Sequence, residues 1–317
     1  MRQAPYSVDF EHGITAIDVE YVRPMLDASH LILHRGRAAF IDTGTTHSVP
    51  GLLQAMADRD ILPEQVEYVF LTHVHLDHAG GAGALMQALP KATAVVHPRG
   101  ARHLAEPEKL IVGTRAVYGD EAFERMYGDI IPIPAGRIHV PVDGEVLELA
   151  GRPLGIMFTE GHARHHYCLT DASAGGVFTG DSFGISYREL DGPSGPFVFP
   201  TTTPVHFDPE AAHEAVDRIM ALTPRYLFLT HFSRVAATPE LARAMHDCLE
   251  AFVELARRHR DQTDRTHLMQ QAMYGCLDDR LDAGGFQGTQ EFRHEILDDD
   301  VRLNVQGLEF WLDHADQ

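Results

Sequence analysis

The 317-residue chain is poor in cysteine and has no long apolar run. Its three cysteines, Cys168, Cys248 and Cys276, are too few and too scattered for a disulfide framework or a CxxC zinc site, which agrees with a reducing compartment. No stretch of about 18 apolar residues is present, so we expect no helix that spans a membrane. The N-terminal stretch also lacks the apolar segment of a secretory signal, which favours the cytoplasm.

Basic side chains are scarce as well, since 26 Lys and Arg stand against 46 Asp and Glu, a formal net charge of −20. The average field of such a surface repels phosphate backbones, so we expect no nucleic-acid partner. A hydrophobic content of 44% and a charged content of 23% are typical of a globular protein. The chain is long enough to bury a large core in one large domain or two smaller ones.

The most informative stretch is HVHLDH, which directly follows the short apolar run 66–71. That run is rich in β-branched and aromatic residues and predicts a buried strand. Alternate side chains of an extended chain share a face, so His73 and His75 would point the same way, as two ligands of one ion must. Small residues behind the motif predict a tight turn into a helix, which would direct Asp77 and His78 at a second ion.

A metal site explains this cluster better than a purely structural role does. A single histidine has many structural uses. Burying four such polar groups together without a cation would instead leave several donors and acceptors unpaired, each at a cost of about 1–3 kcal/mol.

The HxHxDH pattern, followed by Gly80 and Gly81, resembles the signature of the metallo-β-lactamase superfamily, and of its glyoxalase II-like branch in particular. Three later segments are similar to further motifs of that family: TEGH ending at His162, with glutamate in the proline position, FTGD ending at Asp181, and YLFLTH ending at His231. The resemblance covers roughly residues 10 to 235, and all the expected ligand positions are filled in order.

The resemblance implies two divalent metal ions. Its ligand set would place His73, His75 and His162 on the first ion and Asp77, His78 and His231 on the second, with Asp181 bridging them. These ligands are nitrogen and oxygen without thiolate, which suits zinc and also admits iron or manganese. Asp42 would orient a histidine ligand, although an Asx turn suits its Asp-Thr-Gly context equally well. His166 is assigned the same supporting role.

Two such ions can share a water and generate hydroxide near neutral pH. We therefore expect a metal-dependent hydrolase that uses metal-bound hydroxide to cleave a thioester, lactone or other ester-like bond of a small molecule. Asp77 would be catalytic, orienting the hydroxide or passing its proton to the leaving group. Two alternatives stay open: a mononuclear iron enzyme that oxidises a persulfide with oxygen, and a metal-containing small-molecule sensor with little turnover. No clear basic cluster in the C-terminal region would hold glutathione, so the substrate stays open.

Alternating short strands and helices predict layered α/β packing, and the resemblance implies an αββα sandwich. The segment YVFLTH that ends at His73 is echoed by YLFLTH at His231, as expected if two similar sheets face each other. We divide the chain into an αββα domain over 1–238 and a helical C-terminal region over 239–317, which would cap the site or form a homodimer surface. Further short strands are expected at 139–142, 145–149, 154–158, 166–170 and 176–179.

Two segments are candidates for a mobile lid. Residues 98–137 are charged and helical in character, and would form either a substrate-facing lid or a peripheral decoration. Within 190–206 the chain is too rich in proline for a central strand. This loop could wall the substrate pocket together with Tyr187, through Phe197 or Phe199, or simply connect two elements.

Overall fold

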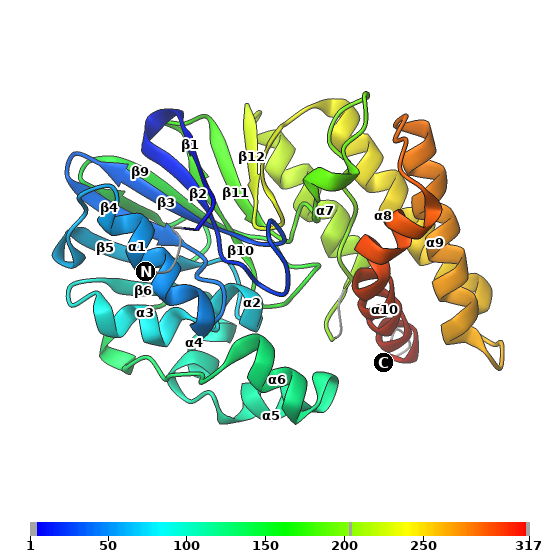
Figure 1. Cartoon of the computed structure of the whole chain (residues 1–317), viewed down its shortest axis with the longest axis horizontal. Helices are drawn as coiled ribbons and strands as arrows, with labels where there is room; N and C mark the ends of the chain where they lie inside the picture. Colours follow the sequence, from blue (N-terminus) through cyan, green and yellow to red (C-terminus); the bar gives the residue numbers. More distant parts are fainter. Residues whose placement is uncertain (1–4, 203–204, 315–317) are drawn as a thin grey trace.

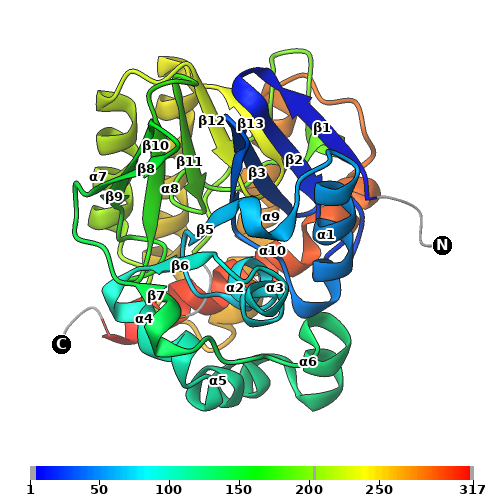
Figure 2. The same ribbon diagram turned by 90° about the vertical axis from the view of Figure 1, so that its left-hand side faces the viewer.

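The computed structural model describes residues 5–202 and 205–314 and contains two β-sheets between layers of helices (Figure 1, Figure 2). Three long helices at the C-terminal end of the chain stand beside this sandwich (Figure 1). The α/β sandwich and the helical C-terminal region are therefore confirmed. Among the described residues no helix is long and apolar enough to cross a membrane.

The first sheet takes its strands in the order of the chain. They are β1 (Ser7–Phe10), β2 (Ile14–Asp18), β3 (Ala28–His34), β4 (Arg37–Ile41), β5 (Val66–Leu71), β6 (Thr93–Val96) and β7 (Ile138–His139). The pairings are antiparallel as far as β4 and parallel from β4 to β7. Arg35 and Gly36 join β3 to β4, and both have positive φ angles, as a tight two-residue hairpin turn requires.

The second sheet has the order β13-β12-β11-β10-β9-β8. Its strands are β8 (Val146–Leu149), β9 (Arg152–Phe158), β10 (Tyr167–Asp171), β11 (Gly176–Gly180), β12 (Tyr226–Leu229) and β13 (Ser233–Ala236). Within it only the pairing of β11 with β12 is parallel. The echoed apolar segments are β5 and β12, one in each sheet, as the repeat of sequence indicated.

Helices cover the outer faces of both sheets, α1 and α3 on the first and α7 and α8 on the second (Figure 2). The α-helices are α1 (Val49–Ala57), α2 (Leu76–Ala79), α3 (Ala82–Ala88), α4 (Pro98–Ala105), α5 (Glu108–Tyr118), α6 (Asp120–Tyr127), α7 (Pro209–Ala221), α8 (Pro239–His259), α9 (Arg265–Ala283) and α10 (Gln290–His314). Short 3-10 helices occur at Glu11–Gly13, Thr46–Ser48, Pro63–Gln65, Ala135–Arg137 and Arg188–Leu190.

Aromatic side chains fill the space between the sheets, among them Phe70, Phe178 and Phe228. Tyr167 of β10 crosses this layer: its hydroxyl donates to the carbonyl of Val95 and accepts from the amide of Leu71, both at 2.9 Å. A buried tyrosine hydroxyl needs such partners. The bonds tie the second sheet to the ends of β5 and β6, where the metal-binding motif begins.

The C-terminal helices share an apolar core with α7 and the outer face of the second sheet. In α8 the buried residues Met245, Cys248, Leu249 and Phe252 follow helical spacing and form one face of the helix. Thr238 caps α8 by accepting from the amide of Leu241 at 3.1 Å. The predicted boundary at residue 238 thus coincides with a helix start.

Two local predictions were wrong, and one strand was missed. The strand expected at 139–142 stops at His139, and Pro141 has no amide hydrogen for a sheet. Strand β13 was not predicted at all. The motif does not end in a plain turn, because α2 begins at Leu76, so that Asp77 and His78 project from a short helix.

Candidate metal centre

The predicted ligands come from four segments that follow the C-terminal ends of strands. His73 and His75 follow β5, and α2 adds Asp77 and His78. The remaining members of the set come from the second sheet: His162 follows β9, Asp181 follows β11 and His231 follows β12. Because both sheets end here, their side chains can converge on one place.

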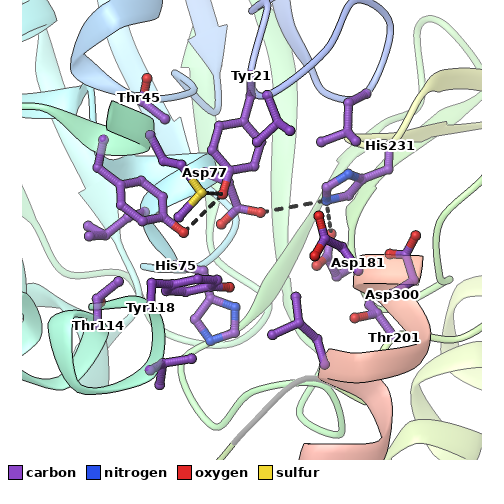
Figure 3. Close-up of a pocket in the computed structure, with 18 of the residues that line it drawn as sticks. Tyr21, Thr45, His75, Asp77, Thr114, Tyr118, Asp181, Thr201, His231 and Asp300 are labelled. Carbon is purple, nitrogen blue, oxygen red and sulfur yellow. Dashed lines mark hydrogen bonds and ion pairs between the residues drawn. The ribbon is translucent and has the colours of Figure 1, made fainter. Parts of the chain in front are cut away.

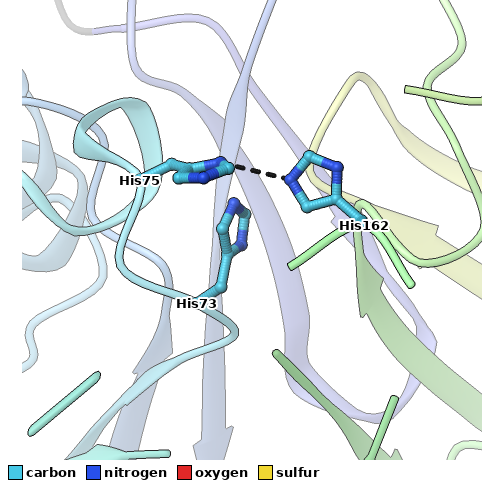
Figure 4. Close-up of side chains that lie close together, drawn as sticks. All are labelled: His73, His75 and His162. Carbon is cyan, nitrogen blue, oxygen red and sulfur yellow. Dashed lines mark hydrogen bonds between the residues drawn. The ribbon is translucent and has the colours of Figure 1, made fainter. Parts of the chain in front are cut away.

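His73, His75 and His162 form the first group (Figure 4). One donor atom of each lies within 4.8 Å of the other two, and Nδ1 of His75 is 3.1 Å from Nε2 of His162. Burial, and then the neighbouring histidines, hold the pKa of His73 and His75 well below the usual value. The rings are therefore neutral, which is the form that binds a metal ion.

Asp77, His78 and His231 form the second group, again with one donor atom each within 4.8 Å. Oδ2 of Asp77 is 3.5 Å from Nε2 of His78 and 3.8 Å from Nε2 of His231. This group sits beside the first, since His73, His78 and Asp181 also meet the same distance limit.

Asp181 contacts histidines of both groups, and it lies beside His231 in Figure 3. Its Oδ1 is 3.3 Å from Nε2 of His78 and 3.5 Å from Nε2 of His231. Its Oδ2 is 3.4 Å from Nε2 of His162. One carboxylate thus presents an oxygen to each group, which is the geometry of a bridging ligand.

In the second group, neighbouring carboxylates raise the pKa of both histidines. Burial lowers the pKa of His78, but Asp181, Asp77 and Asp42 outweigh that effect and raise the pKa well above its ordinary value. Burial likewise opposes the charged form of His231, yet Asp27 and Asp181 raise its pKa to about 9. Without a cation these imidazoles hold protons between the carboxylates, and a divalent ion binding there would displace them.

The residues present fit metal ions. Nε2 of His73 is buried without a hydrogen-bond partner, and Nε2 of His78 and Oδ1 of Asp181 are buried with only ion-pair contacts inside the site. Unpaired buried polar atoms cost about 1–3 kcal/mol each, and coordination to a cation would satisfy all of them. The donors are nitrogen and oxygen only, which suits zinc, iron or manganese.

Asp42 orients one of these histidines. Its Oδ2 accepts from Nδ1 of His78 at 2.9 Å, which leaves Nε2 of that ring for the metal side. The same carboxylate accepts from the hydroxyls of Thr72 and Thr230, both at 2.8 Å. The two echoed Thr-His segments therefore meet at Asp42, which bonds to them rather than to its own loop.

His166 supports the centre from behind. Its Nε2 accepts from the amide of Asp181 at 3.2 Å, and its ring stacks on His73 with centroids 5.0 Å apart. It is not a member of any metal-binding group among the described residues. This position agrees with a residue that holds ligands rather than one that binds the ion.

A cavity of about 1570 Å³ lies over both groups, with His75, Asp77, Asp181 and His231 in its floor (Figure 3). Its walls come from the loop before β3, from α4, α5 and α6, and from α10. Residues 98–137 thus face the cavity through three helices, α4, α5 and α6. The position of this segment agrees with the predicted substrate-facing lid. Its mobility stays a prediction.

The loop at 190–206 reaches the cavity through Thr201, Val205 and His206, whereas residues 203–204 lie outside the described part of the chain. Tyr187 lines the cavity as expected. The assignment of Phe197 and Phe199 was wrong: neither belongs to the lining, because both rings pack into the hydrophobic core beside the C-terminal helices.

Comparison with known proteins decides the family. The family model described as metallo-beta-lactamase superfamily matches residues 24–231. The chain belongs to the metallo-β-lactamase superfamily. The metallo-beta-lactamase fold-containing protein ST1585 of Sulfurisphaera tokodaii is 26% identical over 305 residues, which cover 94% of this chain and 95% of that protein.

Solved structures of this superfamily share the fold. The crystal structure of ST1585 superposes with a TM-score of 0.64 at 23% identity, covering 94% of this chain and 98% of that one. The family protein TTHA1429 from Thermus thermophilus gives a TM-score of 0.68 at 19% identity, covering 96% and 94%. Hydroxyacylglutathione hydrolases of Salmonella are 26% identical over 133 residues, only 42% of this chain and 38% of theirs. That partial match supports the glyoxalase II-like branch only weakly.

Sequence reasoning missed Asp27. This fully buried residue precedes β3, and its Oδ1 lies 2.5 Å from Nδ1 of His231. It holds that ring as Asp42 holds His78, with Nε2 facing the metal side. A single aspartate before an apolar strand carries no spacing signal, so nothing in the local pattern indicated the role.

The C-terminal region lines the cavity through α10, in agreement with the predicted capping role, but the acidic residues of this wall were not predicted. Helix α10 presents Glu295, Asp298, Asp299 and Asp300 to the cavity, beside Arg302. Asp300 accepts from the hydroxyl of Tyr187 at 3.1 Å. Burial raises the pKa of Asp300 to about 7, against smaller opposing effects of His231 and Tyr187.

We expect Asp300→Asn to stabilise the metal-free protein at pH 8 and to change little at pH 5. The folded chain keeps the Asp300 proton up to about pH 7, while the unfolded chain loses it near 3.8. Stability of the wild type therefore falls as pH rises from about 4 to about 7. Thermal denaturation of both chains at pH 5 and pH 8 measures this. An equal difference between them at both values would contradict the assignment.

We expect Gly180→Ala to weaken metal binding about 10–100-fold, the effect typical of disturbing a residue that holds a ligand. Gly180 has a φ of +48°, and a Cβ there would lie 2.5 Å from Nε2 of His166 and 2.7 Å from Oγ1 of Thr72. Metal affinity is measured by titrating metal into protein that was first stripped of metal with a chelator. Gly136→Ala is the control, since its Cβ would meet nothing within 4 Å. Unchanged affinity in Gly180→Ala would show that His166 can shift without consequence.

Proposed function

We propose that this chain is a metal-dependent hydrolase that cleaves a thioester, lactone or other ester-like bond of a small molecule. The observation that carries the proposal is Asp181, whose two oxygens face different groups of ligands. This arrangement favours two cations, most simply zinc, held by the seven ligand positions. When bound, two such ions lower the pKa of a shared water toward about 7 and polarise the bond under attack.

The chain's own residues would orient the reaction. Asp77 lines the cavity and also contacts the second group, so its carboxylate can accept a proton from the attacking water and return it to the leaving group. Asp42 and Asp27 fix the rings of His78 and His231. Each carboxylate binds one ring nitrogen and leaves the other for the ion.

The cavity supports a neutral substrate rather than glutathione thioesters. Its α10 wall brings the carboxylates of Glu295, Asp298 and Asp299 next to one arginine, and the negative field of such a wall disfavours the glutathione carboxylates. Arg302 is already paired with Asp299 at 2.8 Å. Tyr21, Tyr118 and Tyr127 together offer a broad aromatic surface on the opposite side.

Two thioesters with the same acyl group test whether the chain is a metal-dependent hydrolase and whether it prefers a neutral substrate. Protein purified without chelators is analysed for metal content and assayed with the same acyl group on neutral N-acetylcysteamine and on glutathione. We expect about two ions per chain and at least about tenfold higher kcat/KM for the neutral thioester, a difference of about 1.4 kcal/mol. These two thioesters and a series of simple lactones form the substrate panel.

Two results would contradict the proposal. One iron per chain with oxygen uptake on a persulfide would indicate the dioxygenase chemistry. Tight binding of a panel compound without turnover above that of free metal would indicate a sensor.

A further inference from the structure

One histidine of the cavity belongs to none of the metal-binding groups. His165 lies between β9 and β10, three residues after His162, and lines the cavity with a side chain that is 9% exposed. Its Nδ1 is buried without a hydrogen-bond partner. Within the described residues no other group forms a hydrogen bond with the ring.

The ring of His165 stands against the first group. Its centroid is 5.5 Å from that of His75 at an interplanar angle of 87°, and 6.1 Å from that of His73 at 10°. Behind it, α4 approaches closely at Gly100, where a Cβ would lie 3.7 Å from the Cβ of His165. The side chain is thus held between a helix and the metal-binding rings, with one edge toward the cavity.

This environment selects one tautomer. A neutral imidazole carries one N–H, on either Nδ1 or Nε2. A proton on the enclosed Nδ1 would be a buried donor without a partner, and orphaned buried N–H groups are rarer than orphaned acceptors. The proton therefore resides on Nε2, the ring nitrogen that is not enclosed.

We propose that His165 donates a hydrogen bond from Nε2 to the carbonyl oxygen of the substrate, beside the first group of ligands. This inference rests on the proposed hydrolase function. Negative charge develops on that oxygen as water adds to the carbonyl carbon, and a donor already in place stabilises it. Removal of one such donor typically lowers kcat about 10²–10³-fold.

Two variants of His165 separate hydrogen bonding from shape. His165→Phe keeps a flat ring without a donor, and His165→Gln keeps an N–H near the position of Nε2. With the best substrate of the panel, we expect His165→Phe to lower kcat about 10²-fold with a smaller change in KM, and His165→Gln to recover at least about tenfold. Metal content should stay at the wild-type value in both. His267→Phe, at an exposed histidine of α9 outside the cavity lining, is the matched control and should stay within about threefold.

Nitrogen NMR of the metal-free protein gives a readout that needs no substrate. The resonances lost in His165→Phe identify the ring, and their shifts should report the neutral tautomer with the proton on Nε2. An Nδ1–H tautomer would overturn the proposal. So would full activity of His165→Phe, failure of the Gln variant to recover activity, or loss of metal in His165→Phe, which would make His165 a support of His75. If the wild type cleaves no compound of the panel, the hydrolase proposal itself fails.

Discussion

Replacement of Asp181 by asparagine is expected to reduce bound metal from about two ions per chain to about one and to lower hydrolytic turnover about 10³-fold or more. The variant keeps the shape of the side chain but removes the charge that faces both groups of ligands. Even residues that only hold a ligand contribute about 10–100-fold to metal affinity, so loss of a bridging carboxylate should cost more. Metal analysis after dialysis and kcat on the best panel substrate measure the two effects.

A thermal shift on metal addition provides an independent check of the Asp181 variant. The free energy of unfolding should rise by about 3–4 kcal/mol per bound ion when the metal exceeds its Kd by about 100–1,000-fold, so the wild type with two ions should gain more than the variant. Glu160→Gln is the matched control, because this carboxylate lies beside His162 in the sequence but is exposed and pairs with Arg99 at 3.1 Å. Two tightly bound ions in Asp181→Asn would contradict a bridging role.

Replacement of Asp171 by alanine is expected to lower the free energy of unfolding by about 3–5 kcal/mol. Asp171 and Arg152 are almost fully enclosed and form a buried ion pair between β10 and β9. The same carboxylate accepts from the amide of Ser173, and the guanidinium donates to the carbonyl of His12 at 2.6 Å. Removing one partner leaves an uncompensated charge inside the protein, which is the costly case. Urea denaturation of metal-loaded protein measures the loss.

The exposed pair of Arg218 and Asp143, 3.0 Å apart, is the control for that experiment. Asp143→Ala should cost no more than about 1–2 kcal/mol, because solvent screens the pair and the variant otherwise loses only the hydrogen bond from the amide of Phe158. The double variant Arg152→Met with Asp171→Leu should regain much of the stability lost in Asp171→Ala, since apolar pairs of similar volume often replace buried charges. If Asp171→Ala behaves like Asp143→Ala, water must reach the pair.

The candidate site could be predicted from the sequence where short segments carry the information. The spacing of His73 and His75 follows from strand geometry, and His231 repeats the context of His73 in the second sheet. The structure brings all seven predicted ligand positions together. Their role as ligands stays a prediction until metal is measured.

The parts that sequence reasoning missed depend on contacts between distant segments. Asp27 meets His231 across more than 200 residues, and Asp300 reaches the cavity only because α10 packs back against the second half of the chain. His165 looks like an ordinary turn residue until burial of its Nδ1 is known. Such roles arise from tertiary packing and leave no periodic pattern in the sequence.

Helix boundaries show the same limit on a smaller scale. The small residues after His78 suggested a turn, but the amides of His78 and Ala79 donate to the carbonyl of His75 and start α2 there. Propensity alone does not decide a four-residue helix. The surrounding sheets hold α2 in place, and the position of α2 sets the direction in which Asp77 points.

Helix α10 starts at Gln290, well beyond residue 231, where the match to the superfamily ends, yet it supplies a whole wall of the cavity. In the described chain no metal-binding group includes a residue of α10. The cavity-facing residues of α10 can therefore vary without replacing a predicted ligand, whereas its buried Asn304 accepts from the amide of Thr202 at 2.6 Å, beside the Thr201 carbonyl that contacts His162. Exchanging the cavity-facing residues of α10 between related chains should therefore change which substrates the cavity accepts while the predicted metal ligands stay the same.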